Sequence, residues 1–141
     1  MVKRFLLFIL VFSGTFIACN QPEGFEKPED ALDAGREFVR AVLDGNFTKA
    51  EMYVLPEEDD IRLFNRYKDY MKKRSEKERL SLKSSSIQIN KVDEQNDSTA
   101  IINYANSYSK EPVDIKVIKK NGEWWVDFSY TFSGKELEEM K

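Results

Sequence analysis

The clearest β-hairpin signal in this 141-residue chain reads VDIKVIKKNGEWWVD, from Val113 to Asp127. Apolar and polar residues alternate on both sides of an Asn121-Gly122 pair, and Asn-Gly is the strongest short signal for a two-residue hairpin turn. We expect a strand that begins at Val113 and a last strand from Glu123 to Phe132. The buried face of the last strand would carry Trp124, Val126, Phe128, Tyr130 and Phe132.

Two weaker strands precede this hairpin. Residues 84–92 alternate with isoleucines on one face, and residues 99–108 are rich in Ile, Tyr and Thr. The polar residues 94–97 form the turn between them, and residues 109–112 form the next turn. The pattern therefore predicts a four-stranded antiparallel meander.

Helices are predicted before the strands. Residues 31–43 repeat apolar side chains at helical spacing, after Pro28-Glu29-Asp30 and before Gly45. Asn46 is a typical cap for a short second helix. A third helix would run from about residue 57 to the upper 70s, acidic at its start and basic at its end. The sequence thus predicts an α+β fold with N-terminal helices packed on a curved four-stranded antiparallel sheet.

The first 18 residues have the form of a signal peptide. Lys3 and Arg4 precede an apolar run, and small residues lead to Ala18 and then to Cys19, the only cysteine. The apolar stretch of residues 5–18 is shorter than the roughly 20 residues that a membrane span needs. We expect a signal peptide in residues 1–18, a lipidated tether in 19–27, a domain in 28–132 and a polar tail in 133–141.

The segment Phe16-Ile17-Ala18-Cys19 resembles the lipobox of bacterial lipoproteins, in which the cysteine is lipidated and becomes the new amino terminus. This resemblance implies lipidation of Cys19 and attachment to the bacterial cell envelope, facing the periplasm or in the outer membrane. Removal of residues 1–18 changes the formal charge from −3 to −5. Stable anchoring requires at least two acyl chains, since one chain binds a bilayer with only about 10⁴ M⁻¹.

Two further segments carry a resemblance, PEDA at residues 28–31 with FVRAVLDGNFTKA at 38–50, and NGEWWVD at 121–127. Together with the lipobox they resemble small bacterial lipoproteins of unknown function. The domain of those proteins is similar to the cystatin-like, nuclear transport factor 2-like cone fold. That fold hosts enzymes, binding modules and scaffolds, so the resemblance implies a fold and no particular chemistry.

Composition excludes several kinds of chemistry. The chain has 22 Lys+Arg, 25 Asp+Glu and no His. Zinc sites built on His, Ser-His-Asp hydrolysis and Cys-His catalysis are therefore excluded, and we expect no metal and no cofactor. The acidic balance provides no basic footprint for nucleic acid.

Polar aromatic residues are the candidate binding residues. We expect Tyr104 and Tyr108 on the concave side of the sheet and Tyr130 on the last strand. A metal-free lyase or isomerase of the cone fold would need an inward carboxyl group near these tyrosines. Asp114 and Asp127 alternate away from the apolar positions, so we expect them to point to water. We therefore predict no catalytic residues and a non-enzymatic binding module, with a small lyase or isomerase as the alternative.

Alternation places Trp125 on the outer face of the sheet, because Trp124 faces the core. An outward Trp fits a contact with an envelope protein, a glycan or a second copy of the chain across the sheet, and packing against a neighbouring strand is the simpler interpretation. Residues 68–83 contain seven basic and three acidic residues. They would face anionic polymers or form a solvated helix end. A small apolar ligand between helices and sheet is the remaining partner, and Ser98 and Thr99 lie in a weak match to an O-glycan acceptor.

Overall fold

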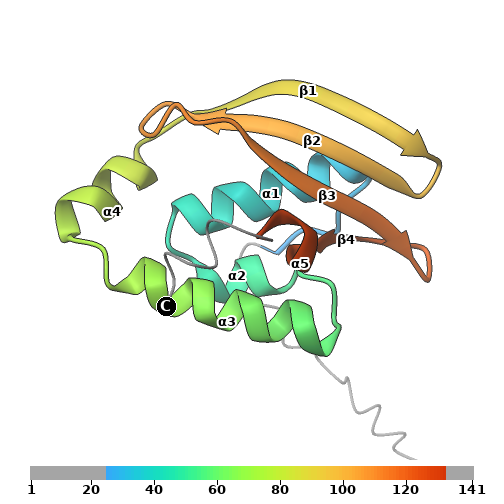
Figure 1. Ribbon diagram of the computed structural model, residues 1–141, viewed down its shortest axis with the longest axis horizontal. Coiled ribbons are helices and arrows are strands. Elements are labelled where there is room, and N and C mark those ends of the chain that lie inside the picture. Colours follow the sequence, from blue (N-terminus) through green and yellow to red (C-terminus); the bar gives the residue numbers. More distant parts are fainter. Residues whose placement is uncertain (1–24, 133–141) are drawn as a thin grey trace, which may run out of the picture.

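The computed structural model describes residues 25–132, which form an α+β fold (Figure 1). The elements follow one another as α1 (Ala31–Leu43), α2 (Phe47–Glu51), α3 (Glu58–Lys72), α4 (Glu76–Lys83), β1 (Ile87–Asn96), β2 (Thr99–Asn106), β3 (Val113–Lys120), β4 (Glu123–Asp127) and α5 (Phe128–Thr131). The helices thus precede a strand meander, as the sequence predicted, except for the short α5.

The four strands form one antiparallel sheet in the order β1-β2-β3-β4. The sheet curves over α1, while α3 lies beyond α1 and α2, on their far side from the sheet (Figure 1). The hairpin between β3 and β4 turns at Asn121 and Gly122, whose φ angles are 53° and 79°. Positive φ at both positions is what a type I′ turn requires, so the Asn-Gly prediction is confirmed.

The core lies between α1 and the concave face of the sheet. Ile102 pairs with Ile115 across β2 and β3, and Val117 pairs with Val126 across β3 and β4; all four side chains are buried. An aromatic cluster fills the side toward α3. In it, the ring of Phe64 lies 5.4 Å from that of Phe128, edge to face. Such edge-to-face pairs add stability beyond the apolar area they bury.

The cap at Asn46 is the one that the sequence predicted, whereas Asp30, expected among the opening residues of the first helix, is its N-cap. The Asp30 side chain accepts a hydrogen bond from the Asp33 N–H, and the Asn46 side chain accepts one from the Lys49 N–H. Gly45 follows α1 with a φ of 73°. The left-handed conformation is accessible to glycine at little cost, so α1 ends here and α2 begins at once.

The long third helix was predicted wrongly. In place of one helix reaching the upper 70s, α3 ends at Lys72 and α4 begins at Glu76. The cause is Ser75, whose hydroxyl accepts from the Glu78 N–H while the Glu78 carboxylate accepts from the Ser75 N–H. This capping box starts a new helix, because it satisfies N–H groups that a continuous helix would bond internally.

The strand boundaries also differ from the prediction. β1 starts at Ile87 and continues through residues 94–96, so the turn lies at residues 97–98. β4 ends at Asp127 and not at Phe132, because the Asp127 side chain accepts from the Tyr130 N–H and caps α5. As a result Phe128 and Phe132 still reach the core, but Tyr130 is exposed on a helix. Trp124 is only half-buried.

The domain also begins earlier than predicted. Phe25, expected in the tether, packs its ring 5.2 Å from that of Tyr53, and the Tyr53 hydroxyl donates to the Glu26 carbonyl. Lys27 forms an ion pair with Glu123 at 2.9 Å. Residues 25–27 are therefore part of the folded unit.

Candidate ligand-binding cavity

A cavity of about 210 Å³ lies where α3 approaches the sheet near the end of β2. Its apolar wall comes mainly from α1 and α3, and its polar wall comes from α3, β2 and the loop after β2. The lining includes the side chains of Val39, Val42, Tyr67, Tyr70, Arg74, Tyr104, Tyr108, Glu111 and Phe132. Concave sites with apolar walls and a few convergent polar groups are typical of ligand binding.

The polar face of α3 results from helical spacing. Tyr67 and Tyr70 are three residues apart on α3, so they share one side of the helix, and Arg74 follows in the bend between α3 and α4. The Tyr67 ring lies 4.6 Å from the Phe132 ring and 5.6 Å from the Phe128 ring. These contacts hold the Tyr67 ring against the core, with its hydroxyl end at the cavity.

The loop after β2 forms the rim. The Asn106 side-chain oxygen accepts from the N–H groups of Tyr108 and Ser109, at 3.1 and 2.9 Å, and its amide donates to the Ser109 hydroxyl. This arrangement is a local turn built on an Asn side chain. It fixes Tyr108 and Glu111, both exposed, at the edge of the cavity.

Two of the cavity tyrosines, Tyr67 and Tyr104, keep their hydroxyl protons. Burial raises the pKa of Tyr104 to about 12. Burial also raises the pKa of Tyr67, and the nearby Tyr104 adds to the increase while Arg74 opposes it. Both groups are thus neutral hydrogen-bond donors at physiological pH.

Arg74 is the charged group of the cavity. Its guanidinium carbon lies 5.3 Å from the centre of the Tyr70 ring, in a cation–π arrangement, and Nη2 is 3.5 Å from the Tyr70 hydroxyl. Its Nε is buried and has no hydrogen-bond partner. An unsatisfied buried donor is rare in folded proteins and costs about 1–3 kcal/mol.

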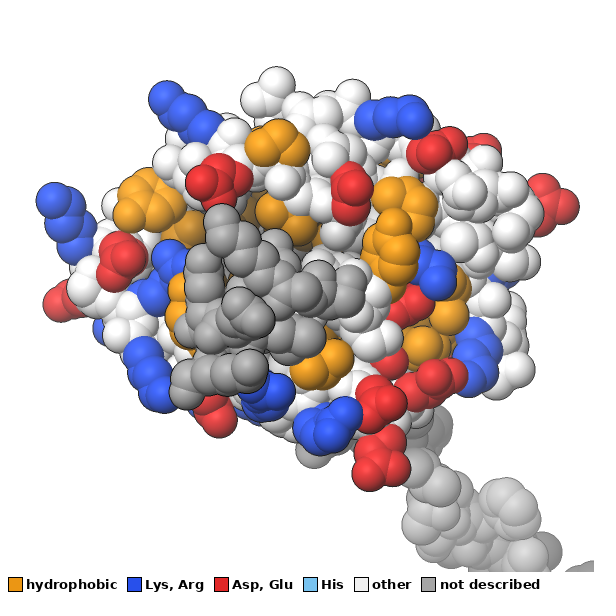
Figure 2. Space-filling model, in the orientation of Figure 1, with side chains coloured by type: hydrophobic (Ala, Val, Ile, Leu, Met, Phe, Trp, Pro, Cys, Tyr) orange, Lys and Arg blue, Asp and Glu red, His pale blue; other side chains and the backbone are white. Residues whose placement is uncertain are grey.

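A larger groove of about 450 Å³ lies between the end of α1 and α4. Its floor is formed by Val42, Leu43, Phe47, Met71 and Leu82, and Leu80 lies at its edge, 60% exposed. In Figure 2 apolar side chains reach the surface in the region of α4, beside Lys and Arg side chains. Basic and acidic side chains mix around this face, so it has no field of one sign.

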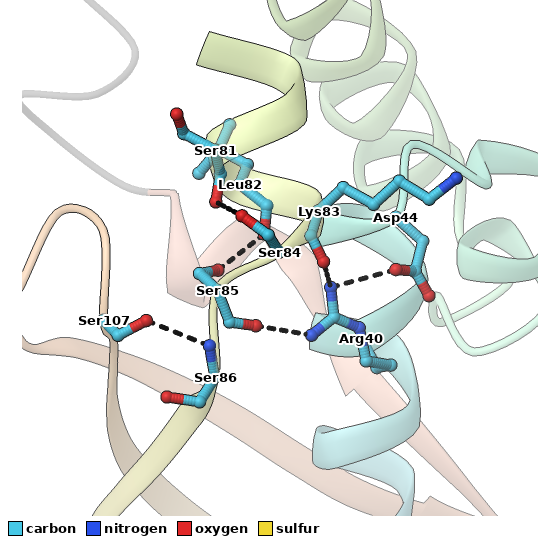
Figure 3. Close-up of polar contacts among 9 residues, drawn as sticks. All are labelled: Arg40, Asp44, Ser81, Leu82, Lys83, Ser84, Ser85, Ser86 and Ser107. Carbon is cyan, nitrogen blue, oxygen red and sulfur yellow. Dashed lines mark hydrogen bonds and ion pairs between the residues drawn. The ribbon is translucent and has the colours of Figure 1, made fainter. Parts of the chain in front are cut away.

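A cluster of polar contacts holds α4 in place (Figure 3). The Arg40 guanidinium on α1 donates to the carbonyl oxygens of Ser85 and Lys83, at 2.8 and 3.0 Å, and to the Asp44 carboxylate at 2.9 Å. Cations at a helix C-terminus satisfy carbonyl groups that have no partner in the helix. The same cluster joins Ser86 to Ser107, whose hydroxyl accepts from the Ser86 N–H. Arg40 therefore fixes the wall that both cavities share.

The sequence-predicted binding residues do not form one site. Tyr104 and Tyr108 line the smaller cavity together with Asn106. Trp125 lies opposite Ile118 on the outer face of the sheet and is half-buried. Tyr130 lies on α5, with the Lys116 ammonium 5.3 Å from its ring centre. Cys19 lies outside the described residues.

Sequence reasoning missed the roles of Tyr67, Tyr70 and Arg74. It counted Arg74 only among the basic residues of 68–83 and gave neither tyrosine a role in binding. The available signal was the polar tip at every turn of an otherwise apolar stripe, at positions 67, 70 and 74. The partner surface across the cavity depends on tertiary packing, which local periodicity does not specify.

Two acids, Asp127 and Asp60, bind the backbone at the start of α5. Asp127 does not point to water: it pairs with Lys116 at 2.9 Å and caps α5. Asp60, which was not singled out, is buried and accepts from the N–H groups of Phe128 and Ser129, at 2.6 and 3.0 Å. Both carboxylates hold the start of α5, and neither lines the cavity.

The described residues contain no helix long and apolar enough to cross a membrane. Within residues 25–132 no three acidic, His or Cys side chains come together as a metal site would require. In comparisons with known proteins, no family model, no curated protein and no solved structure matches this chain.

Proposed function

We propose that this protein is a lipid-anchored component of the bacterial cell envelope whose domain is a non-catalytic binding module for a small molecule. The observation that supports binding is the cavity of about 210 Å³ whose lining combines apolar side chains with tyrosines and Arg74. The observation that supports anchoring is the lipobox-like sequence that ends at Cys19. An envelope protein, a glycan or a second copy of the chain on the outer face near Trp125 is a lesser possibility.

The proposal includes the finer fold assignment, a cystatin-like or nuclear transport factor 2-like cone. A curved antiparallel sheet with a long helix in its concave face, and a cavity at one end, supports that assignment. The α+β class stands without it.

The alternative, a metal-free lyase or isomerase, has less support. It needs a carboxyl group in hydrogen-bond reach of a cavity tyrosine. Glu111 is the only acid among the described residues of the cavity lining, and it is exposed on the loop. No hydrogen bond joins a carboxylate to the hydroxyl of Tyr104 or Tyr108 within residues 25–132.

A cavity-blocking variant tests the binding function. Val113 lines the cavity at the start of β3, so Val113→Phe places a ring in that space. In ligand-observed NMR with a mixture of small aromatic fragments, we expect the full chain in mild detergent to bind some fragments. We expect Val113→Phe to bind none.

The matched control is Ile118→Phe, which places the same side chain on the opposite face of the same strand. This control should bind fragments like the wild type. Equal fragment binding by wild type and Val113→Phe would show that the cavity is not the binding site, and the proposed function would then be abandoned.

A further inference from the structure

We infer that the cavity binds a small organic anion, with a carboxylate head against Arg74 and the cavity tyrosines and an apolar body among the side chains of α1 and Phe132. This inference rests on the proposed function and adds the chemical class of the ligand. Four observations support it: a loosely paired guanidinium in the cavity lining, phenol donors in the same lining, one lining acid that lies at the exposed rim, and the size of the apolar space.

The guanidinium of Arg74 is only loosely paired by the protein. Nη1 is 3.9 Å from the nearest Glu78 oxygen, Nη2 is 3.5 Å from the Tyr70 hydroxyl, and the side chain is 30% exposed where it lines the cavity. Arginine presents its N–H groups as a fork that matches the two oxygens of a carboxylate. A ligand carboxylate can therefore pair with the accessible Nη groups, whereas Nε is closed to the cavity.

Glu78 pairs only loosely with Arg74, since Oε1 is 3.9 Å from Nη1 and the other oxygen, Oε2, is bound to Ser75. One Glu78 oxygen accepts from the Ser75 N–H at 2.9 Å and from the Ser75 hydroxyl at 2.7 Å. These bonds belong to the capping box that starts α4, and they lower the pKa of Glu78. The acid beside Arg74 is thus directed to the helix start, and the charge of Arg74 remains incompletely paired.

Two phenols complete the polar end. The Tyr67 and Tyr104 side chains come from opposite walls, α3 and the sheet, and neither hydroxyl bonds to another residue of the described chain. Because both hydroxyls remain protonated, each can donate to an oxyanion. The only acid among the described lining residues is Glu111, at the exposed rim.

The apolar part sets the size of the ligand. The space of about 210 Å³ is walled by Val39, Val42, Met71, Leu82 and Phe132. A dry apolar cavity of about 150 Å³ is known to hold a benzene ring. An aromatic or short aliphatic acid therefore fits, whereas a drug-sized ligand requires about 300 Å³ or more.

The test compares benzoate with benzyl alcohol, which has a similar body but no charge, by NMR titration of the full chain in mild detergent. We expect benzoate to bind more tightly. In Arg74→Gln, benzoate affinity should fall roughly 10- to 100-fold while benzyl alcohol affinity changes little, because a hydrogen bond to a charged group is lost. Tyr67→Phe and Tyr104→Phe should each weaken benzoate about 3- to 10-fold.

The matched control is Arg66→Gln, which should leave benzoate binding unchanged. Arg66 is exposed on α3 and lies outside this cavity. Equal binding of benzyl alcohol and benzoate, or a full benzoate affinity in Arg74→Gln, would overturn the anion inference and leave the proposed function intact. Inorganic phosphate that binds as well as benzoate would overturn the apolar-body part. If neither aromatic probe nor any fragment binds the wild type, the proposed function fails as well.

Discussion

Gly35 is the residue at which α1 approaches the sheet most closely. A β-carbon built at this position would lie 2.7 Å from Cδ1 of Ile102 and 3.0 Å from Cδ1 of Ile115. A glycine inside a helix costs roughly 1 kcal/mol relative to alanine, so the close approach explains its use here. The sequence shows the glycine at a buried helical position, but it does not show the two isoleucine methyl groups that it faces.

Gly35→Val should destabilise the protein by about 1–3 kcal/mol, because the added carbons overpack the contact between α1 and the sheet. Gly35→Ala should be less destabilising than Gly35→Val, since its one methyl group needs only a shift of the terminal isoleucine carbons and the gain in helix propensity offsets part of that cost. Urea unfolding of the full chain measures both. Arg36→Val, exposed on the same helix, should cost less than about 0.7 kcal/mol. If Gly35→Val matched this control, the close packing described here would be wrong.

The contribution of Asp60 to folding stability depends on pH with the opposite sign to that of most carboxylates. Burial raises the pKa of Asp60, although the N–H groups of Ser129 and Phe128 oppose the increase. The folded chain therefore keeps the proton at pH values where the unfolded chain has lost it. The stability that Asp60 contributes is present below its ordinary pKa of 3.8 and is lost as pH rises through the raised value.

Relative to Asp60→Asn, the wild type should thus lose stability as pH rises above about 4. Asp127→Asn should show the reverse. Burial alone would raise the pKa of Asp127, but Lys116 and the N–H of Tyr130 outweigh it and lower that pKa. The stability that Asp127 contributes is therefore lost as pH falls below 3.8. Denaturant titrations at several pH values measure both slopes. The same slope for both variants would contradict the assignment, and Asp69→Asn, exposed on α3, serves as the control.

At the scale of elements, local signals predicted what neighbouring residues decide. The cap at Asn46 and the turn at Asn121-Gly122 involve residues within four positions of each other, and both predictions are confirmed. The break at Ser75 was also readable, because Ser-x-x-Glu is a capping box, but the uninterrupted basic pattern favoured one helix. The end of β4 was not readable, since the apolar alternation continues through Phe132 and α5 depends on the distant Asp60.

The attachment of α4 depends on one side chain from another element. Arg40→Gln removes the donors to the Ser85 and Lys83 carbonyls and leaves these groups without their partner. We expect local opening, seen as amide hydrogen exchange in residues 76–86 that is about tenfold faster, with little change in the β3–β4 hairpin. Arg36→Gln, one turn earlier on α1 and exposed, should leave exchange unchanged. Uniform acceleration over the whole domain would indicate global destabilisation and would argue against a local clamp.

For the whole molecule, the sequence predicted the fold class more fully than the site. Strand alternation correctly directed Tyr104 toward the cavity, because a strand has only two faces. The facing residues Tyr67 on α3 and Arg74 in the bend after it lie 30 or more positions away in the chain. Their relation to Tyr104 is set by how the helix packs on the sheet, and a single sequence does not specify that packing.

The relation of the domain to the membrane depends on Cys19, which precedes the folded unit by a short segment. The described packing begins at Phe25, held against Tyr53. Five residues separate Cys19 from Phe25, and a fully extended chain over those six steps spans at most about 20 Å. Lipidation of Cys19 would therefore keep the start of the folded domain at Phe25 close to the bilayer surface.

We expect Cys19→Ser, expressed in a bacterial host, to move from the membrane fraction to the soluble fraction and to lose incorporation of a clickable palmitate. Loss of both acyl chains removes an anchor that no other described segment replaces. The urea unfolding midpoint should not change, because the packing described for the domain starts at Phe25. Asn20→Ser should remain membrane-bound and labelled. Mass spectrometry of the processed wild type should find a lipidated Cys19 at the amino terminus, and a free thiol there would refute the anchoring proposal without bearing on ligand binding.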